Sequence, residues 1–104
     1  MPIVPIFYDI PVSMTLIKVR AVKPLGGHKL WFEFSDGSQG ERDFADFLCK
    51  DRPVLKPLRN ADYFARVFLQ RGAPTWPNGF DLAPWALHDD MERDNALTRP
   101  LRVA

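Results

Sequence analysis

The stretch Trp76-Pro77-Asn78-Gly79-Phe80-Asp81-Leu82-Ala83-Pro84 decides much of the fold, because two prolines, an Asn-Gly pair and two large aromatic residues fall within nine positions. The prolines fix φ and remove backbone donors, and Asn78-Gly79 supplies the positive-φ step of a tight turn. The aromatic rings offer large apolar areas to bury, and we expect Trp76 and Leu82 in the core. The stretch therefore predicts a rigid turn in which the Asp81 carboxylate is the group that could carry chemistry.

The composition around this stretch is that of an ordinary globular protein. The 104 residues are 46% hydrophobic and 26% charged, which fits a single domain that buries a core without disulfides or a metal. We expect residues 1–14 to form an N-terminal arm, residues 15–90 the core and residues 91–104 a C-terminal tail. The formal net charge of +1 gives no global argument for nucleic-acid binding.

The N-terminal arm and the single cysteine bear on the compartment. The arm is apolar but contains several prolines and Asp9, without a basic leader or a small-residue cleavage pattern. It therefore predicts neither a signal peptide nor a membrane span, and it is free to lie along the core, add a strand or bind a partner. Cys49 is the only cysteine and lacks the Cys/His spacing of a zinc site, so a reducing, cytoplasmic location fits best.

Alternation of apolar and polar residues predicts an antiparallel sheet in the first half of the chain. Residues 15–22 alternate over part of their length, and we expect Pro24-Leu25-Gly26-Gly27 to break this first strand. Residues 29–35 alternate more clearly, and Asp36-Gly37 is a hairpin signal that returns residues 39–44 as a short, polar edge strand. The faces of the second strand carry Leu30, Phe32 and Phe34 on one side and Lys29, Trp31 and Glu33 on the other.

Helical signals follow the predicted meander. Residues 43–48 place apolar side chains at helical spacing behind Asp43 as a possible N-cap, and Pro53 and Pro57 predict an extended crossing. Asn60 is suited to cap a second helix, whose end competes with a strand that starts at residues 67–70.

A second hairpin and a last helix complete the predicted fold. The Arg71-Gly72 turn predicts pairing of residues 67–70 with residues 73–76, and Pro74 restricts that strand to an edge or to a position with its N–H side free. Pro84 suits the first turn of a helix that runs from Trp85 to about Arg93. We therefore predict an α+β fold, in which two or three short helices pack on a small antiparallel sheet, a meander plus a second short hairpin.

Three motifs in this order carry a resemblance to a known family. They are Phe34-Ser35-Asp36-Gly37, then Pro57-Leu58-Arg59-Asn60 with Phe64 and Val67, then Thr75-Trp76-Pro77-Asn78-Gly79-Phe80-Asp81-Leu82. Over about residues 15–90 the chain resembles the domain of unknown function 2442, a family of short bacterial proteins. The resemblance implies a compact α+β domain with an antiparallel sheet, and it implies no established biochemical role.

The family also supplies two analogies about partners. Some members resemble fusions to a helix-turn-helix segment, and others are encoded beside a second small protein, which suggests a toxin–antitoxin pairing. Only about a dozen residues follow the last predicted helix here, too few for a helix-turn-helix. The chain also departs from the family in having His88 where Tyr is common and Ala83 where many members have a polar cap.

Titratable residues offer weak signals for a catalytic or metal site. His88 and Glu92 stand at helical i, i+4 spacing and would hold a metal only with a third ligand, so a solvated helix face is the favoured interpretation. Asp36, Asp43, Asp46 and Asp81 would form an acid/base pair only if the fold joined two of them. The turn and helix starts explain the first three, and we expect Asp81 to stabilise its loop. No histidine is suitably spaced to activate Cys49. We predict no catalytic residue, metal or cofactor.

Recognition through the surface is the leading hypothesis. Trp31 lies opposite the apolar face of its strand, and Trp85 follows Pro84, so each is either covered or exposed as an interface residue. The sequence favours a non-enzymatic protein-interaction module, the antitoxin-like or regulatory member of a two-protein system, with a protein partner or self-association and no membrane. The candidate binding residues are Trp31, Trp76, Asn78, Asp81, Trp85 and His88.

Two alternatives stay open. The first is a ligand-binding or enzymatic domain with a pocket around the loop between Trp76 and Asp81, joined by His88. The second is a nucleic-acid-associated regulator, for which a local basic group exists, although residues on the solvent-facing side of a sheet explain it better. The basic group consists of Lys18, Arg20, Lys23, His28 and Lys29, near Trp31.

Overall fold

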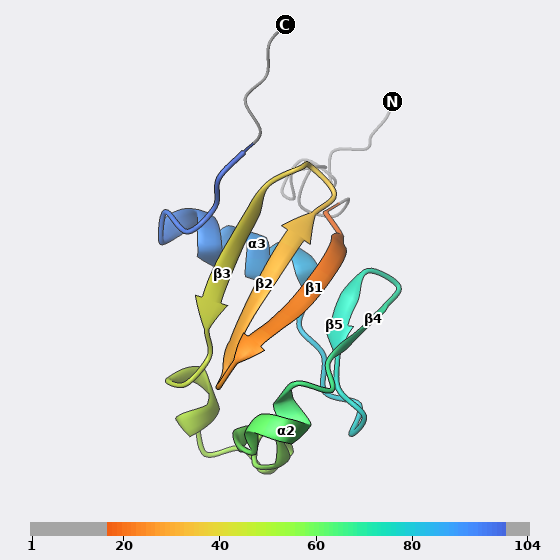
Figure 1. Ribbon diagram of the computed structural model, residues 1–104, viewed down its shortest axis with the longest axis vertical. Coiled ribbons are helices and arrows are strands. Elements are labelled where there is room, and N and C mark those ends of the chain that lie inside the picture. The colour runs from red at the N-terminus through yellow and green to blue at the C-terminus, as the bar shows by residue number, and fades with distance from the viewer. Residues whose placement is uncertain (1–16, 100–104) are drawn as a thin grey trace, which may run out of the picture.

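The computed structural model describes residues 17–99, and its strands and helices confirm an α+β fold (Figure 1). Strands β1 (Val19–Gly26), β2 (Lys29–Phe34) and β3 (Gln39–Asp43) form an antiparallel meander in that order. The alternation of β2 places Phe32 and Phe34 among the fully buried residues of the core. The predicted meander is therefore confirmed.

The first strand ends later along the chain than the sequence predicts. Pro24 does not end β1 but pairs with Leu30 of β2, and the reversal comes at Gly26 and Gly27, whose φ values are 102° and 58°. Because β1 is at the edge of its three-stranded sheet, the missing N–H of Pro24 breaks no essential ladder bond. The expected break is thus wrong at Pro24 and Leu25, which belong to β1, and confirmed at Gly26 and Gly27.

The segment after β3 is built from short helical turns. Three 3-10 turns, η2 (Phe47–Cys49), η3 (Pro53–Leu55) and η4 (Pro57–Arg59), precede the short helix α2 (Ala61–Phe64). The predicted extended crossing at Pro53 and Pro57 is wrong, because each proline opens a turn that accepts its fixed φ and needs no donor there. Asp43 ends β3, and its Oδ1 accepts the Ala45 N–H at 2.9 Å instead of capping a helix.

The second half of the chain follows the predictions closely. The Oδ1 of Asn60 caps α2 by accepting the Tyr63 N–H at 3.0 Å. Strands β4 (Phe68–Gln70) and β5 (Ala73–Thr75) form the second hairpin, with Pro74 opposite Leu69. After β5 the chain returns along it, with a bridge between Thr75 and Asp81, and helix α3 (Pro84–Arg93) follows.

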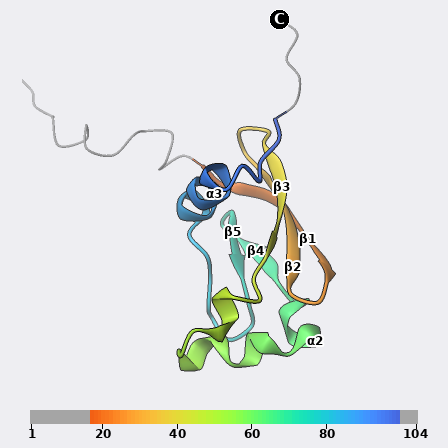
Figure 2. The ribbon, with the colours of Figure 1, turned by 90° about the vertical axis from the view of Figure 1, so that its left-hand side faces the viewer.

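The core lies between the meander and the elements packed on one of its faces (Figure 2). Helix α3 and the β4–β5 hairpin lie on the same side of the meander, and the 3-10 turns with α2 close one end. Aromatic residues from each part meet there, and Trp76 contacts Phe64 and Phe80 at ring-centroid distances of 5.5 and 5.8 Å. The buried hydrophobic residues are Val19, Leu30, Phe32, Phe34, Phe44, Leu48, Leu55, Leu58, Phe64, Trp76, Leu87 and Met91.

Residues that follow α3 pack on the edge of the meander. Gln39 and Thr98 exchange two backbone hydrogen bonds of 2.9 and 2.8 Å. A Cβ at Gly40 would lie 2.1 Å from the carbonyl oxygen of Ala96, so only glycine permits this approach. The expected C-terminal tail is therefore wrong for residues 96–98, whereas the N-terminal arm, residues 1–14, lies outside the described residues.

Candidate functional site

The first family motif builds the turn between β2 and β3. Phe34 is buried, and the Ser35 Oγ accepts the backbone N–H of Lys18 at 3.0 Å. The Oδ1 of Asp36 accepts the N–H and the Oγ–H of Ser38 at 3.0 and 2.6 Å. Gly37 completes the turn with φ of 89°. Each of the four residues thus has a structural task.

The second motif ties three short turns together. The Arg59 guanidinium donates to the carbonyl oxygens of Leu48 at 2.7 Å and Lys50 at 3.1 Å, and its own carbonyl lies 2.8 Å from the Nε2 of His28. Leu58 is buried, and Asn60 caps α2. His28, predicted as part of a basic group, is therefore a fixed element of the fold.

The third motif begins with core residues. Trp76 is 1% exposed and donates its Nε1–H to the carbonyl oxygen of Phe64 at 2.8 Å. Its predicted place in the core is confirmed, and this burial removes it from the set of accessible binding residues. Leu82 packs against the core, and its N–H donates to the Pro74 carbonyl at 2.9 Å.

Asn78 holds the turn of the third motif in place. Its Nδ2 donates to the carbonyl oxygen of Val54 at 3.0 Å, and its Oδ1 accepts the Phe80 N–H at 3.1 Å. Gly79 follows with φ of 91°. The side chain of Asn78 is thus occupied by backbone contacts and is poorly placed to bind a ligand. We call residues 44–64 together with residues 76–80 the turn end of the molecule.

Asp81 differs from its neighbours in the motif. It is exposed, its backbone forms the bridge to Thr75, and its carboxylate has no hydrogen bond or ion pair with any residue between 17 and 99. The predicted stabilisation of the loop by this carboxylate is therefore wrong, because Asn78 performs that task. Asp81 instead lines two clefts, of about 330 and 630 Å³.

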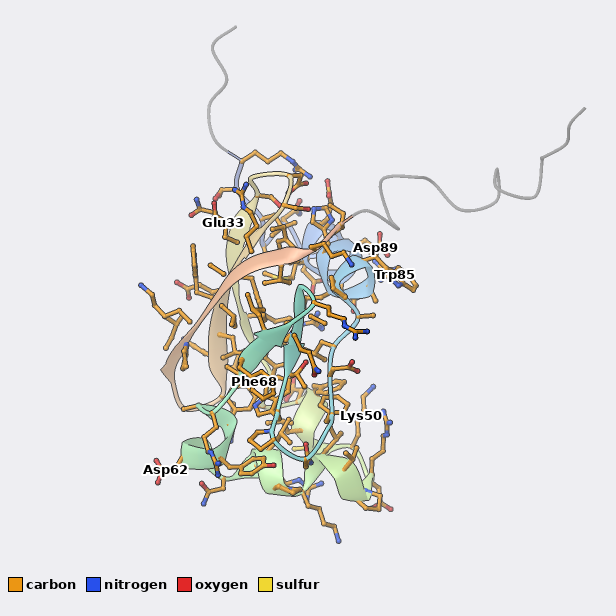
Figure 3. The ribbon with its side chains drawn as sticks, turned by 90° about the vertical axis from the view of Figure 1, so that its right-hand side faces the viewer. Glu33, Lys50, Asp62, Phe68, Trp85 and Asp89 are labelled. Atoms are coloured by element: carbon orange, nitrogen blue, oxygen red, sulfur yellow. The ribbon has the colours of Figure 1, made fainter. Side chains whose placement is uncertain are left out.

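The smaller cleft gathers charged residues around an exposed indole, and we call it the Trp85 cleft. It lies between the start of β1, the β4–β5 turn and the start of α3, and Trp85 is 48% exposed beside it (Figure 3). Lys18, Arg71 and Asp81 line it, yet within residues 17–99 none of the three forms an ion pair. The lining residues are Ile17, Lys18, Gln70, Arg71, Ala73, Asp81, Pro84 and Trp85.

The backbone holds the two cations of the Trp85 cleft in place. Arg71 has φ of 55°, a conformation that L-residues other than Asn and Asp rarely adopt. Gly72 follows, and a Cβ there would lie 2.8 Å from Cδ of Lys18, so the lysine stem packs directly over this glycine. The sequence analysis places Arg71 in a turn and Gln70 in a strand, and it does not identify either as a binding residue. An arginine that precedes a turn glycine is only a weak signal for binding.

His88, in the middle of α3, belongs to an ionic cluster between this helix and the β2–β3 turn. Its Nε2 lies 3.0 Å from Asp36, its Nδ1 lies 3.9 Å from Glu92, and its ring packs edge-on against Phe34. Arg99 contacts both acids, at 2.9 Å from Glu92 and 3.9 Å from Asp36. Within the part of the chain that the structure describes, no group of three acidic, histidine or cysteine side chains is placed to hold a metal ion.

The turn and the cluster together set the charge state of Asp36. Burial alone would raise the pKa of this carboxyl, but the hydrogen bonds from Ser38 and from His88, with the charge of His88, outweigh burial. The pKa of Asp36 is therefore lowered below its ordinary value of 3.8. His88 thus contributes to a surface network that joins α3 to the β2–β3 turn, and it lines neither of the two clefts.

Trp31 lies on the outer face of the meander, which is the face away from α3. It is half-buried, and Nζ of Lys23 lies 5.8 Å from its ring centroid. The predicted basic group is not a separate patch, because Lys18 lines the Trp85 cleft and Arg20 pairs with Glu33 at 2.8 Å. The fold thus separates the six candidate residues: Asn78 and Asp81 line the larger cleft, and Asp81 and Trp85 line the Trp85 cleft with Lys18 and Arg71.

Comparisons with known proteins place the chain in a family. A model of a family of proteins of unknown function, DUF2442, matches residues 19–90, so the chain belongs to this family, as its three motifs predict. Among curated proteins, none matches the chain. None of the helices within residues 17–99 is long and apolar enough to cross a membrane.

A solved structure is also similar to this chain. It is the crystal structure of a protein from Nitrosomonas europaea named a "putative DNA binding protein", which is 28% identical and superimposes with a TM-score of 0.56. The match covers 78% of this chain and 63% of that chain. The chain therefore spans less than two thirds of the length of this relative.

Proposed function

We propose that this chain is a non-enzymatic, cytoplasmic protein-interaction module that binds a segment of a partner protein at the Trp85 cleft. The observation that carries the proposal is that charged residues of this cleft have no ion-pair partner within the described chain. Lys18, Arg71 and Asp81 line one cleft without an ion pair to each other or to any other described residue. Charged groups left without partners beside an exposed Trp85 are suited to contacts with another molecule.

The chemistry of the cleft defines the segment it would accept. Trp85 and Pro84 offer an apolar surface for an aliphatic or aromatic side chain. Beside that anchor, Lys18 and Arg71 suit a carboxylate, and Asp81 suits a cation or an N–H donor. Since the backbone around Lys18 and Arg71 is fixed by packing, little entropy is lost there on binding.

An enzymatic function receives less support from the polar side chains. Within residues 17–99, the rings of His28 and His88 are engaged by the Arg59 carbonyl and by Asp36. Cys49 is exposed and lines neither cleft. The hydroxyl of Ser38, which is bonded to Asp36, is buried, and neither cleft is lined by a serine, threonine or cysteine of the described chain. The carboxylate of Asp81 in these clefts is therefore better suited to recognition.

The partner that we favour is the second protein of a two-protein system. Members of this family that are encoded beside a second small protein suggest that the partner is the product of a neighbouring gene. We therefore propose a regulatory or antitoxin-like role, in which this chain occupies a surface of that second protein. Strength of binding would come from the Trp85 anchor, and selectivity from the three charged residues.

Co-expression with the neighbouring gene product tests the proposal. We expect the two proteins to purify together, and Trp85→Ala to weaken the affinity by about thirtyfold, since loss of an aromatic anchor costs about 2 kcal/mol. Phe68→Ala is the matched control, because Phe68 is 44% exposed and lines neither cleft. Wild-type affinity in the Trp85→Ala protein, or no partner in the co-expression, would contradict the proposal.

Nucleic-acid binding is a second candidate, favoured by the name of the Nitrosomonas europaea relative. Lys18 and Arg71 would then contact phosphates, and retention on DNA would fall steeply as salt rises. Replacing both with alanine should reduce the slope of log affinity against log salt by about two. Absence of binding to duplex and single-stranded DNA at low salt would remove this candidate.

A further inference from the structure

The segment that follows the turn of the third motif adds a third, unlabelled row to the β4–β5 hairpin. It runs antiparallel to β5, and Asp81 lies opposite Thr75. The hydrogen bonds that flank this pair, each of 2.9 Å, run from the Trp76 N–H to the Phe80 carbonyl and from the Leu82 N–H to the Pro74 carbonyl. In this pattern the two opposed residues exchange no hydrogen bond. The backbone N–H and carbonyl of Asp81 therefore point away from β5.

Three backbone groups on the outer edge of this segment have no hydrogen-bond partner within residues 17–99. They are the N–H and the carbonyl of Asp81 and the N–H of Ala83. Ala83 has an extended backbone, with φ of −69° and ψ of 121°, and its carbonyl accepts the Leu87 N–H at the start of α3. Asp81 and Ala83 are both exposed. An edge of this kind is a template for pairing with another extended chain.

The same edge lines the larger cleft, of about 630 Å³. Apolar side chains from η2 and from the third motif line this cleft as well, and the ring centroids of Phe47 and Phe80 are 6.1 Å apart. Phe47, Phe80 and Leu82 are half-buried, so part of each side chain is accessible. The cleft therefore combines accessible apolar side chains with unpaired backbone groups, and an extended polypeptide is the class of ligand that satisfies both.

The charged residues of the two clefts favour an acidic ligand. Arg52 lines the larger cleft, Lys18 and Arg71 line the Trp85 cleft, and Asp81 lines both. None of these four residues forms an ion pair with a described part of the chain. Three cations thus face one carboxylate, and the shared Asp81 makes the clefts neighbours that one segment can enter together.

We propose that an extended, acidic segment of the partner protein adds a strand to the edge at residues 81–83. The inference rests on the proposed function for the choice of partner. An antiparallel segment satisfies all three backbone groups, because one of its residues exchanges two hydrogen bonds with Asp81 and the carbonyl two positions earlier accepts the Ala83 N–H. The segment residue opposite Leu82 points to the same face as Leu82, so an apolar side chain there contacts Phe47 and Phe80.

Ala83→Pro in the full chain tests the strand addition, because it removes one edge donor. The φ of −69° suits proline and the N–H has no described partner, so the fold should be retained. We expect the affinity for the neighbouring gene product, measured by titration calorimetry, to fall by about tenfold or more. The matched control is Ala61→Pro, an exposed alanine at the first position of α2 that lines neither cleft, and it should bind like the wild type.

Amide hydrogen exchange followed by NMR provides a second measurement on the wild-type protein. The amides of Asp81 and Ala83 should exchange rapidly in the isolated full chain, and binding of the neighbouring gene product should slow both by at least about tenfold. Unchanged exchange in the complex would overturn the proposal. Slow exchange of both amides in the isolated chain would also overturn it, because another part of the chain or a second copy would then occupy the edge.

The Trp85→Ala variant separates this inference from the proposed function. If Trp85→Ala weakens binding and Ala83→Pro binds like the wild type, the strand addition is wrong and the Trp85 cleft is retained as the site. If Ala83→Pro and Trp85→Ala have the opposite effects, the edge is retained and the Trp85 anchor is wrong. Circular dichroism of each variant shows whether a loss of binding comes from unfolding.

Discussion

The turn end and the Trp85 cleft use their polar side chains in opposite ways. At the turn end, Arg59, Asn60 and Asn78 are each hydrogen-bonded to backbone atoms of the described chain. At the cleft, Lys18 and Asp81 line a hollow without an ion-pair partner among residues 17–99. Both regions contain residues of the family motifs, so membership of a motif does not by itself mark a binding residue.

In a small protein of this kind, side chains without internal partners are the better candidates for binding. A side chain that closes a turn or caps a helix is already stabilised, and a ligand would have to replace those bonds. A charged side chain held on a fixed backbone without a partner has no such cost. Substitutions at the turn end should therefore lower the free energy of unfolding, whereas substitutions at the Trp85 cleft should lower it little or not at all.

The largest difference in the free energy of unfolding is expected between alanine variants of two tryptophans. Trp76→Ala should lower the free energy of unfolding by about 3–5 kcal/mol, because it removes a fully buried ring and leaves the Phe64 carbonyl without its donor. Trp85→Ala should change it by less than about 0.5 kcal/mol. Urea unfolding measured by circular dichroism gives both values. Equal losses in the two variants would remove the distinction between the regions.

Two arginines provide the next test. Arg59→Ala should cost about 1–2 kcal/mol, since the Leu48 and Lys50 carbonyls lose their donor. Arg71→Gly should instead raise stability by about 0.5–1 kcal/mol, because glycine adopts the φ of 55° without strain. Thermal unfolding of both variants beside the wild type provides the comparison. A destabilised Arg71→Gly protein would show that Arg71 has a structural role after all.

A smaller difference is expected within the third motif itself. Asn78→Ala should cost about 1 kcal/mol, because Val54 and Phe80 lose hydrogen-bond partners in an exposed turn. Asp81→Ala should be neutral within about 0.5 kcal/mol. Chemical denaturation of the pair measures both, and a costly Asp81→Ala substitution would return this carboxylate to the structural residues.

The smallest effect concerns pH and the Asp36 carboxyl. Its pKa is lowered in the folded protein, so its contribution to stability is complete above the ordinary value of 3.8 and is lost as the pH falls through the lower, folded value. Asp36→Asn should therefore unfold with a weaker dependence on pH below about 4 than the wild type. Urea midpoints at neutral and acidic pH measure this, and parallel curves for the two proteins would contradict it.

Sequence patterns correctly predict the elements whose formation depends on residues that are close together in the chain. The alternation of β2, the Asn60 cap and the start of α3 after Ala83 are each explained by residues within a few positions. The path of β1 through Pro24 is different, because it depends on the edge position of that strand. Pro53 and Pro57 also fit both an extended segment and a 3-10 turn, and the buried Leu55 and Leu58 decide between them.

The candidate site was also predictable only in part, because local patterns do not report contacts between distant parts of the chain. Asp81 stands out in the sequence because it follows Asn78-Gly79 in a rigid loop, although the sequence favours stabilisation of that loop as its role, and Trp85 stands out because it follows Pro84. Lys18 and Arg71 join them across 53 positions of the chain, and no local pattern reports that approach. Helical spacing predicts His88 on the surface of a helix, but its partner Asp36 lies 52 residues away.

The pairing of Gln39 with Thr98 has a consequence for the order in which the protein folds. The strands of the meander are joined by tight turns, whereas the bridge between Gln39 and Thr98 closes a loop of 59 residues. Closing a longer loop costs more chain entropy, so we expect the meander to form early and this bridge late. Amide exchange should then be faster at Thr98 than at Phe32 in the native protein. Equal protection would mean that the last strand contact forms together with the rest.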